Sequence, residues 1–172
     1  PSEVLILADS STNPRYVALD MVAQAEHDSS AASVLVTTSM NLAEEVQEEV
    51  KSVLEDIPRE RTAAKALEEY GNIIVVNDLD SGIDFANDYA PEHLEIMTRR
   101  PDDVVDRIEH AGAIFIGSNS PNSAGDFAVG PSHVLPTGGE ARSFAGLSVQ
   151  DFVRMTSVQK LNSCVILFFI NV

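Results

Sequence analysis

Residues 4–8 read Val-Leu-Ile-Leu-Ala, an apolar run without a polar interruption. A strand of this kind fits the interior of a parallel sheet, because helices cover both faces of such a sheet and neither face meets water. Similar runs recur, and the predicted strands are residues 4–8, 33–37, 73–77, 94–98 and 113–116. Amphipathic stretches lie between them, with predicted helices at residues 15–27, 42–56, 60–70, 82–89 and 102–110. This alternation predicts the α/β class, with a mostly parallel sheet flanked by helices.

The segment from residue 117 to residue 146 differs from the rest, because Gly, Ser, Pro and Asn dominate it and no periodic pattern is visible. A connection of about thirty residues without regular structure is uncommon inside a compact domain and usually either has a function or is disordered. The segment contains Asp126 and His133, two side chains that can take part in chemistry. We therefore expect a functional loop here, followed by a last helix over residues 148–158.

The composition indicates one soluble globular domain. The chain has 172 residues, of which 44% are apolar, enough to build a single core. The 27 acidic residues outnumber the 11 basic ones and give a formal net charge of −16. This charge repels phosphate backbones and anionic lipid surfaces, so we expect neither nucleic acid nor a membrane as a partner. The apolar run at residues 164–170 is far shorter than the roughly 20 residues that span a bilayer.

Cys164 is the only cysteine, which excludes an internal disulfide bond and fits a reducing cytoplasm. The first residue is Pro1 instead of Met, and residues 3–8 read as a buried strand and not as a leader peptide. We therefore expect the chain to be a piece of a longer cytoplasmic protein.

The predicted helix at residues 15–27 carries polar side chains on one face. Gln24 and His27 are three residues apart, and Asp20 lies one turn before them. The opposite face is apolar, with Ala18, Met21, Val22 and Ala25. Such a helix could pack on the sheet and present half of a metal site to a cleft. A solvated polar face is the alternative, since glutamine is an unusual zinc ligand.

Glu92 and His93 stand side by side just before the predicted strand at residues 94–98. Histidine is suited to proton transfer near neutral pH, and a carboxylate in a dry pocket can act as a base toward water. Adjacent residues in an extended segment point in opposite directions, so the two need a turn if they are to act together. In the alternative interpretation, Pro91 and Glu92 begin a helix.

Asp126 of the loop could meet Gln24 and His27 in a three-ligand site of oxygen and nitrogen donors that leaves room for a substrate. Sequence spacing alone does not establish that meeting. His110 ends a predicted helix, where a partial negative charge suits a cation, so we interpret it as structural. The chain has no GxGxxG or Walker-type spacing and therefore no dinucleotide fingerprint.

Five short blocks contain most of these side chains. They are Pro1-Ser2-Glu3-Val4-Leu5, Gln24-Ala25-Glu26-His27, Tyr89-Ala90-Pro91-Glu92-His93-Leu94, Ser123-Ala124-Gly125-Asp126 and His133-Val134-Leu135-Pro136-Thr137. In this order they closely resemble the histidinol dehydrogenase family. The resemblance implies a partial Rossmann-like domain that holds the zinc and substrate site over residues 1–160. Residues 161–172 form a C-terminal tail that does not resemble the family.

The resemblance also implies roles for individual residues. Gln24, His27 and Asp126 match the ligands of one zinc ion per site, and Glu92 and His93 match the pair that performs acid/base catalysis. The positions that match substrate-binding residues are Ser2, Gln24, His27, His93, Asp126 and His133.

The implied reaction is the oxidation of L-histidinol to L-histidine through L-histidinal, with two hydride transfers to NAD, in the last steps of histidine biosynthesis. In the family, His93 would remove the alcohol proton and Glu92 would activate water. The family's NAD-binding residues lie before the segment that matches this chain. Its fourth zinc ligand comes from a later segment of the neighbouring subunit in a homodimer. We therefore expect the 172-residue chain alone to have little or no activity, and NADH formation from histidinol by this chain would contradict that expectation.

Two other functions remain open at this point. The first is a related zinc- and NAD-dependent alcohol dehydrogenase that acts on another polar alcohol, which assays with hydroxylated sulfonates or other amino alcohols would reveal. The second is a non-catalytic zinc-binding α/β domain, which would bind zinc weakly through three ligands without any turnover.

Overall fold

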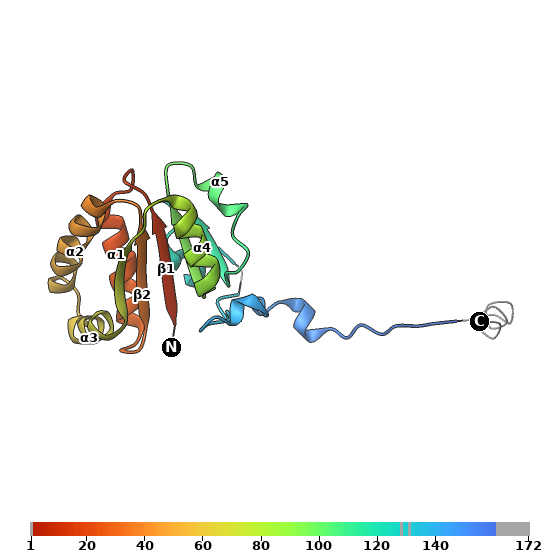
Figure 1. The fold of residues 1–172 in the computed structure, drawn as a ribbon. Coiled ribbons are helices and arrows are strands. Elements are labelled where there is room, and N and C mark those ends of the chain that lie inside the picture. Colours follow the sequence, from red (N-terminus) through yellow and green to blue (C-terminus); the bar gives the residue numbers. More distant parts are fainter. Residues whose placement is uncertain (1, 128, 131, 161–172) are drawn as a thin grey trace.

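A sheet of parallel strands forms the centre of the protein (Figure 1). The computed structural model describes residues 2–127, 129–130 and 132–160, with residues 126 and 127 described at the level of the backbone. The strands are β1 (Glu3–Ala8), β2 (Ala32–Thr37), β3 (Gly71–Val75), β4 (His93–Met97) and β5 (Ala113–Ile116). They pair in the order β3-β2-β1-β4-β5, every pair parallel. The predicted α/β class with a parallel sheet is confirmed.

The helices cover both faces of the sheet. They are α1 (Pro14–His27), α2 (Met40–Glu55), α3 (Glu60–Tyr70), α4 (Leu79–Tyr89), α5 (Pro101–Val105) and α6 (Asn122–Phe127). The side chains of Asn13, Ser39 and Asp78 accept hydrogen bonds from backbone amides at the starts of α1, α2 and α4, which satisfies donors that a helix leaves free. Helices α1 and α2 pack on one face of the sheet, and α4 and α5 pack on the other.

Strand register decides which side chains of β4 face α1. Alternate residues of a strand point to opposite faces, so Val4 and Ile6 pack toward α1 and α2 while Leu5 packs toward α4. The β1–β4 register places Val4 beside His93 and Ile6 beside Glu95. Since paired residues of parallel strands point to the same face, His93 and Glu95 lie on the α1 side. The polar side chains of β4 therefore enter the same layer as Gln24.

The predicted helix over residues 148–158 is wrong, because only a short 3₁₀ turn, η2 (Val149–Phe152), forms there. The side chains of Val149, Phe152 and Val153 are 80%, 79% and 59% exposed. A short helix is marginal in water without an apolar surface to pack against. In Figure 1 this part of the chain runs away from the sheet, so none of the described elements offers it such a surface.

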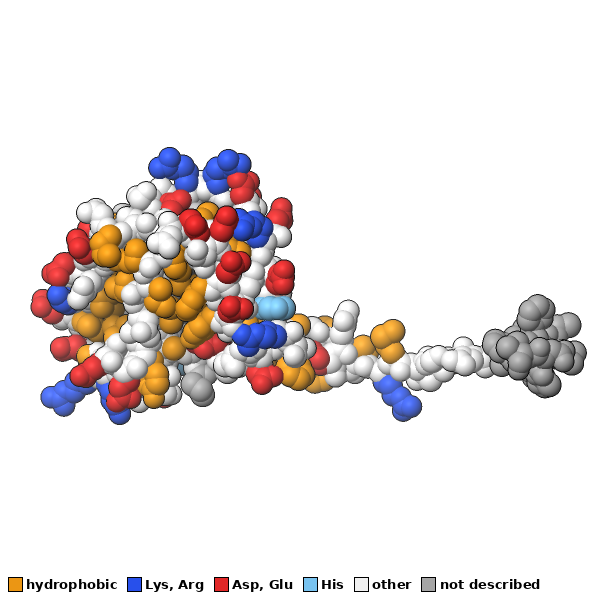
Figure 2. Space-filling model, in the orientation of Figure 1, with side chains coloured by type: hydrophobic (Ala, Val, Ile, Leu, Met, Phe, Trp, Pro, Cys, Tyr) orange, Lys and Arg blue, Asp and Glu red, His pale blue; other side chains and the backbone are white. Residues whose placement is uncertain are grey.

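Other differences are smaller. Helix α5 ends at Val105, where the prediction extended to residue 110, and the predicted loop over residues 117–146 contains α6 and a 3₁₀ turn, η1 (Glu140–Arg142). The predicted tail at residues 161–172 lies outside the described residues. Within the described part of the chain, no helix is both long and apolar enough to cross a membrane. Figure 2 shows acidic side chains spread over the visible surface of the folded body, as the net charge leads one to expect.

Candidate functional site

Glu3 and Glu92, at the amino ends of β1 and β4, are joined by reciprocal hydrogen bonds. The backbone N–H of Glu3 donates to Oε2 of Glu92 at 3.0 Å, and the N–H of Glu92 donates to Oε1 of Glu3 at 3.2 Å. Both side chains are buried. We call this pair of reciprocal hydrogen bonds the Glu3–Glu92 clamp. Because the β1–β4 pairing starts one residue later, the clamp extends the sheet register into the loop before β4.

Glu3 also accepts two further hydrogen bonds. The Tyr89 hydroxyl donates to its Oε2 at 3.2 Å, and the N–H of Gly138 donates to its Oε1 at 3.0 Å. Burial, followed by the negative charge of Glu3 and the hydrogen bond to it, raises the pKa of Tyr89 to about 12. Tyr89 therefore stays protonated and donates throughout the neutral range. Glu3 thus joins the end of α4 and the loop at Gly138 to the clamp.

The same strand end fixes the imidazole of His93. Its Nδ1 lies 2.9 Å from the backbone carbonyl oxygen of Glu3. A carbonyl oxygen can only accept, so this contact assigns the proton to Nδ1 and leaves Nε2 of a neutral ring as the proton acceptor. A carboxylate oxygen of Glu92 lies 4.0 Å from Nδ1. A bend at Glu92 brings the two side chains together, and β4 begins at His93, so Pro91 and Glu92 do not begin a helix.

The backbone on both sides of Glu92 is tightly constrained, by an unusual conformation at Ala90 and by close packing of Gly112. Ala90, which ends α4, has a φ of 53°, in the left-handed region that L residues rarely adopt. Gly112 packs against the backbone of Glu92, and a Cβ at position 112 would lie 2.5 Å from the Glu92 carbonyl oxygen. Strained backbone and close approach of this kind are common where a side chain is held for a chemical task.

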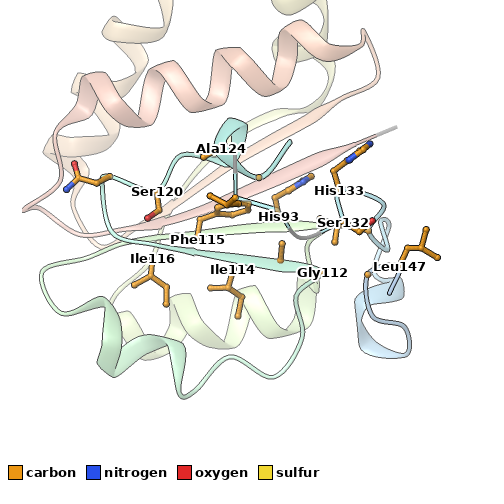
Figure 3. A pocket seen from close by; sticks show the side chains of 16 residues that line it. His93, Gly112, Ile114, Phe115, Ile116, Ser120, Ala124, Ser132, His133 and Leu147 are labelled. Carbon is orange, nitrogen blue, oxygen red and sulfur yellow. The ribbon is translucent and has the colours of Figure 1, made fainter. Parts of the chain in front are cut away.

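A pocket of about 600 Å³ opens beside His93. It lies between β5, α6 and the loop that follows α6, and its lining includes Phe115, Ser120, His133 and Leu147 (Figure 3). The rings of His93 and Phe115 lie 6.1 Å apart between centroids. The pocket offers an apolar floor together with two imidazoles, His93 buried and His133 exposed. It can take a small ligand with polar ends.

A second cavity of about 260 Å³ lies over α1 and the start of α6, and Gln24, His27, Asn122 and Ser123 line it. Gln24 is buried and bridges two neighbours: its Nε2 donates to Ser2 Oγ, and its Oε1 accepts from Asn122 Nδ2, each at 2.9 Å. His27 is exposed at the end of α1. The structure therefore places Gln24 and His27 at one cavity and bonds Gln24 to Ser2, while their roles at a site stay predictions.

Asp126 lies on α6, one helical turn after Asn122, but its side chain is outside the described part of the structure. Its contact with Gln24 and His27 stays a prediction. Among the described side chains, no group of three or more His, Cys, Asp or Glu residues could hold a metal ion. The donors that are described, an amide oxygen and an imidazole at one cavity, fit two ligands of a mixed oxygen and nitrogen zinc site.

Comparison with known proteins shows the family. The sequence model of the family named histidinol dehydrogenase matches residues 1–166. The chain belongs to the histidinol dehydrogenase family. Histidinol dehydrogenases of Methanothermobacter thermautotrophicus and Aquifex aeolicus are each 49% identical to it, over 94% and 92% of this chain and 38% and 37% of theirs. A crystal structure of histidinol dehydrogenase from Elizabethkingia anophelis matches 98% of this chain and 39% of its own, with a TM-score of 0.93 and 38% identity.

The chain thus spans a little over a third of the length of these histidinol dehydrogenases. The part it shares with them includes every site residue named above. It also includes residues that sequence reasoning missed, namely Glu3, Glu95 and Asn122. A signal for Glu95 was present, because a carboxylate interrupts the apolar strand His93-Leu94-Glu95-Ile96-Met97.

Glu95 and Asp20 form a buried pair of carboxyl groups. Burial, followed by the charge of Asp20, raises the pKa of Glu95 well above its ordinary range, although a hydrogen bond from the Asn122 backbone opposes this. Burial raises the pKa of Asp20 to about 6, with a hydrogen bond to Glu95 acting in the opposite direction. The pair therefore keeps a proton near neutral pH.

This pair predicts a pH-dependent gain from Asp20→Asn. Well below the ordinary Asp pKa of 3.8, the Asp20 carboxyl is protonated in both the folded and the unfolded chain, so it does not change the free energy of unfolding. As pH rises toward 6 the unfolded chain ionises first, so the unaltered protein loses stability. We expect the Asn variant to be more stable by on the order of 2 kcal/mol at pH 7, and we expect this gain to fall to about 0.5 kcal/mol at pH 4.

Urea unfolding at both pH values measures this difference. Asp102→Asn is the matched control, because it removes one negative charge from an exposed position on α5. A gain for Asp20→Asn that is the same at pH 4 and pH 7 would contradict the prediction.

Proposed function

We propose that this chain is the zinc- and substrate-binding part of a histidinol dehydrogenase that oxidises L-histidinol to L-histidine through L-histidinal, with NAD as the oxidant. The observation that supports this most is the arrangement at β4. The Glu3–Glu92 clamp and the Glu3 carbonyl hold Glu92 and His93 in one place and leave Nε2 of His93 as the proton acceptor.

His93 has the proton-transfer role in the first oxidation. An alcohol loses its proton as its carbon loses a hydride, and a neutral imidazole nitrogen at a pocket wall can take that proton. The hydrogen bond from Nδ1 to the Glu3 carbonyl stabilises the ring when it becomes charged. His133 lines the same pocket and supports an additional contact to the substrate.

Glu92 has its role in the second oxidation, in which water must add to the aldehyde carbon before the second hydride can leave. A carboxylate held beside the imidazole can accept a proton from that water. The N–H of Glu3 keeps one Glu92 oxygen in position, so the carboxylate is oriented before water arrives.

Gln24, His27 and Asp126 would hold the zinc ion, Gln24 through its amide oxygen. When bound, zinc would anchor and polarise the alcohol oxygen, and NAD would accept the two hydrides. Ser2 supports the ligand set indirectly, because its hydroxyl accepts from the Gln24 amide nitrogen and so leaves the amide oxygen on the side of Asn122, which lines the cavity with Gln24. We also propose a cytoplasmic homodimer, on the family resemblance alone.

A chimera tests the proposed activity. Residues 2–160 would replace the matching segment of the Aquifex aeolicus histidinol dehydrogenase, whose remaining segments would supply the rest of that enzyme. We expect NADH formation from L-histidinol at a rate within tenfold of the parent enzyme. A folded chimera that reduces NAD only with other amino alcohols or with hydroxylated sulfonates would overturn the proposed substrate.

Zinc content tests the proposed ligands. We expect the chain to bind about one zinc, and we expect His27→Ala and Asp126→Asn each to weaken binding by at least about tenfold, because each removes one donor from a small set. His110→Ala is the matched control, since His110 lines neither the pocket at His93 nor the cavity at Gln24 and His27. Equal zinc binding by the unaltered chain and the His27 variant, measured by titration with a competing chelator, would contradict the assignment.

A further inference from the structure

Glu95 is a carboxylate in the middle of an apolar layer. It lies in β4 beside Ile6, its side chain is 1% exposed, and it faces α1. The backbone N–H of Asn122, the first residue of α6, donates to Glu95 Oε1 at 2.7 Å. A buried charge-bearing side chain is costly unless its partners are in place. The sheet therefore holds the start of α6 through a buried carboxyl group, not through apolar packing alone.

A continuous set of hydrogen bonds leads from Glu95 through Asn122 and Gln24 to Ser2. Asn122 Nδ2 donates to Gln24 Oε1, and Gln24 Nε2 donates to Ser2 Oγ. Asn122 and Gln24 are 8% and 5% exposed, so these bonds lie away from bulk water. Each group orients the next, and the carboxyl group of Glu95 is the member that belongs to the rigid sheet.

Helix α6 stands between the two cavities described above. Its residues Asn122 and Ser123 line the cavity at Gln24 and His27, whereas Ala124 and Gly125 line the pocket at His93. Gly125 sits against Phe115 so closely that a Cβ would lie 2.7 Å from the ring. A shift of α6 would therefore change both cavities at once.

We propose that Glu95 is a positioning residue: by binding the Asn122 backbone it sets α6 between the two cavities and orients the Gln24 amide oxygen toward the cavity at His27. The part that concerns Gln24 as a ligand rests on the proposed function; the placement of α6 does not. Residues that orient metal ligands typically change metal affinity by 10- to 100-fold when they are removed.

Asp20 explains how Glu95 can be tolerated. Glu95 Oε2 has no hydrogen-bond donor among the described groups, and a proton shared with the neighbouring Asp20 carboxyl meets that need. Burial raises the pKa of both groups, which favours the shared proton. A glutamine at position 95 would keep one acceptor oxygen and carry its own hydrogens, so it can take the place of the protonated pair.

The test uses the 172-residue chain and two measurements. Exchange of the backbone amide hydrogen at position 122, followed by NMR, reports on the bond to Glu95, and a zinc titration reports on Gln24. For Glu95→Leu we expect at least tenfold faster exchange and at least tenfold weaker zinc binding. For Glu95→Gln we expect both values to stay within about threefold of the unaltered chain, as for the control Thr98→Val, which changes a buried polar group beyond the end of β4.

Asn122→Ala separates the two parts of the proposal, because it keeps the backbone bond to Glu95 and removes the bridge to Gln24. It is expected to weaken zinc binding but to leave amide exchange at position 122 unchanged, and it gives the answer if Glu95→Leu fails to fold. Unchanged amide exchange in a folded Glu95→Leu variant overturns the placement of α6 by Glu95. Unchanged zinc binding in Asn122→Ala overturns the orientation of Gln24 through Asn122. If the unaltered chain binds no zinc, the same titrations are made in the chimera, which supplies the remaining segments, and a chimera that binds no zinc overturns the zinc assignment of the proposed function. The exchange measurement decides the placement of α6 in either case.

Discussion

Replacement of His93 by Gln is expected to lower the rate of histidinol oxidation about a thousandfold in the chimera, because general base catalysis contributes factors of this order. Glutamine keeps the size and the polar character of the side chain. Its amide can still donate to the Glu3 carbonyl, as His93 Nδ1 does. What it lacks is a nitrogen that can accept a proton at neutral pH. The loss is therefore expected in turnover and not in folding.

The rate of NADH formation at saturating histidinol measures this effect, and a circular dichroism melt shows whether the variant is folded. His110→Gln serves as the matched control, because His110 lies between α5 and β5 and contacts neither cavity. A folded His93→Gln enzyme that keeps more than a tenth of the turnover would exclude His93 as the proton acceptor.

Replacement of Glu3 by Ala is expected to destabilise the protein by about 3 kcal/mol, since it leaves one buried and two partly buried donors without their acceptor. These donors are the N–H of Glu92, the N–H of Gly138 and the hydroxyl of Tyr89. The same change opens one half of the Glu3–Glu92 clamp. Activity of the chimera should therefore fall together with stability.

Glu3→Gln separates hydrogen bonding from charge. Its amide oxygen can still accept from the two backbone N–H groups, and its nitrogen can donate to the Tyr89 hydroxyl, so most of the stability should remain. Urea unfolding measures both variants, with Glu69→Ala on the exposed side of α3 as the control. A Glu3→Ala variant as stable as this control would show that the clamp contributes nothing.

The sequence predicted regular elements well where a periodic pattern and a terminating residue occur together. Helix α3 and strand β5 match their predicted bounds of 60–70 and 113–116. The prediction failed at residues 148–158, where the pattern is helical but no surface of the described chain receives the apolar side chains. Periodicity states which face a helix would bury and says nothing about whether a partner surface exists.

The sequence also made Glu92 and His93, and Gln24 and His27, candidates for a site, with a helix start and a solvated polar face as the structural alternatives. The resemblance of the five blocks to one family is what favoured the functional interpretation. The sequence did not single out Glu3, although Glu3 binds Glu92 and, through its carbonyl, His93. These residues are about ninety positions apart, and only the pairing of β1 with β4 makes them neighbours. No local pattern contains that information.

The sequence by itself determined the α/β class, the side-chain chemistry and the family resemblance, because these depend on local pattern and on the identity of short blocks. The tertiary structure decided how those blocks meet. The β1–β4 register assigns the proton of His93 to Nδ1, and the buried bond between Glu95 and Asn122 places α6 between the two cavities. Both results depend on contacts between distant segments, which form only when the sheet has assembled.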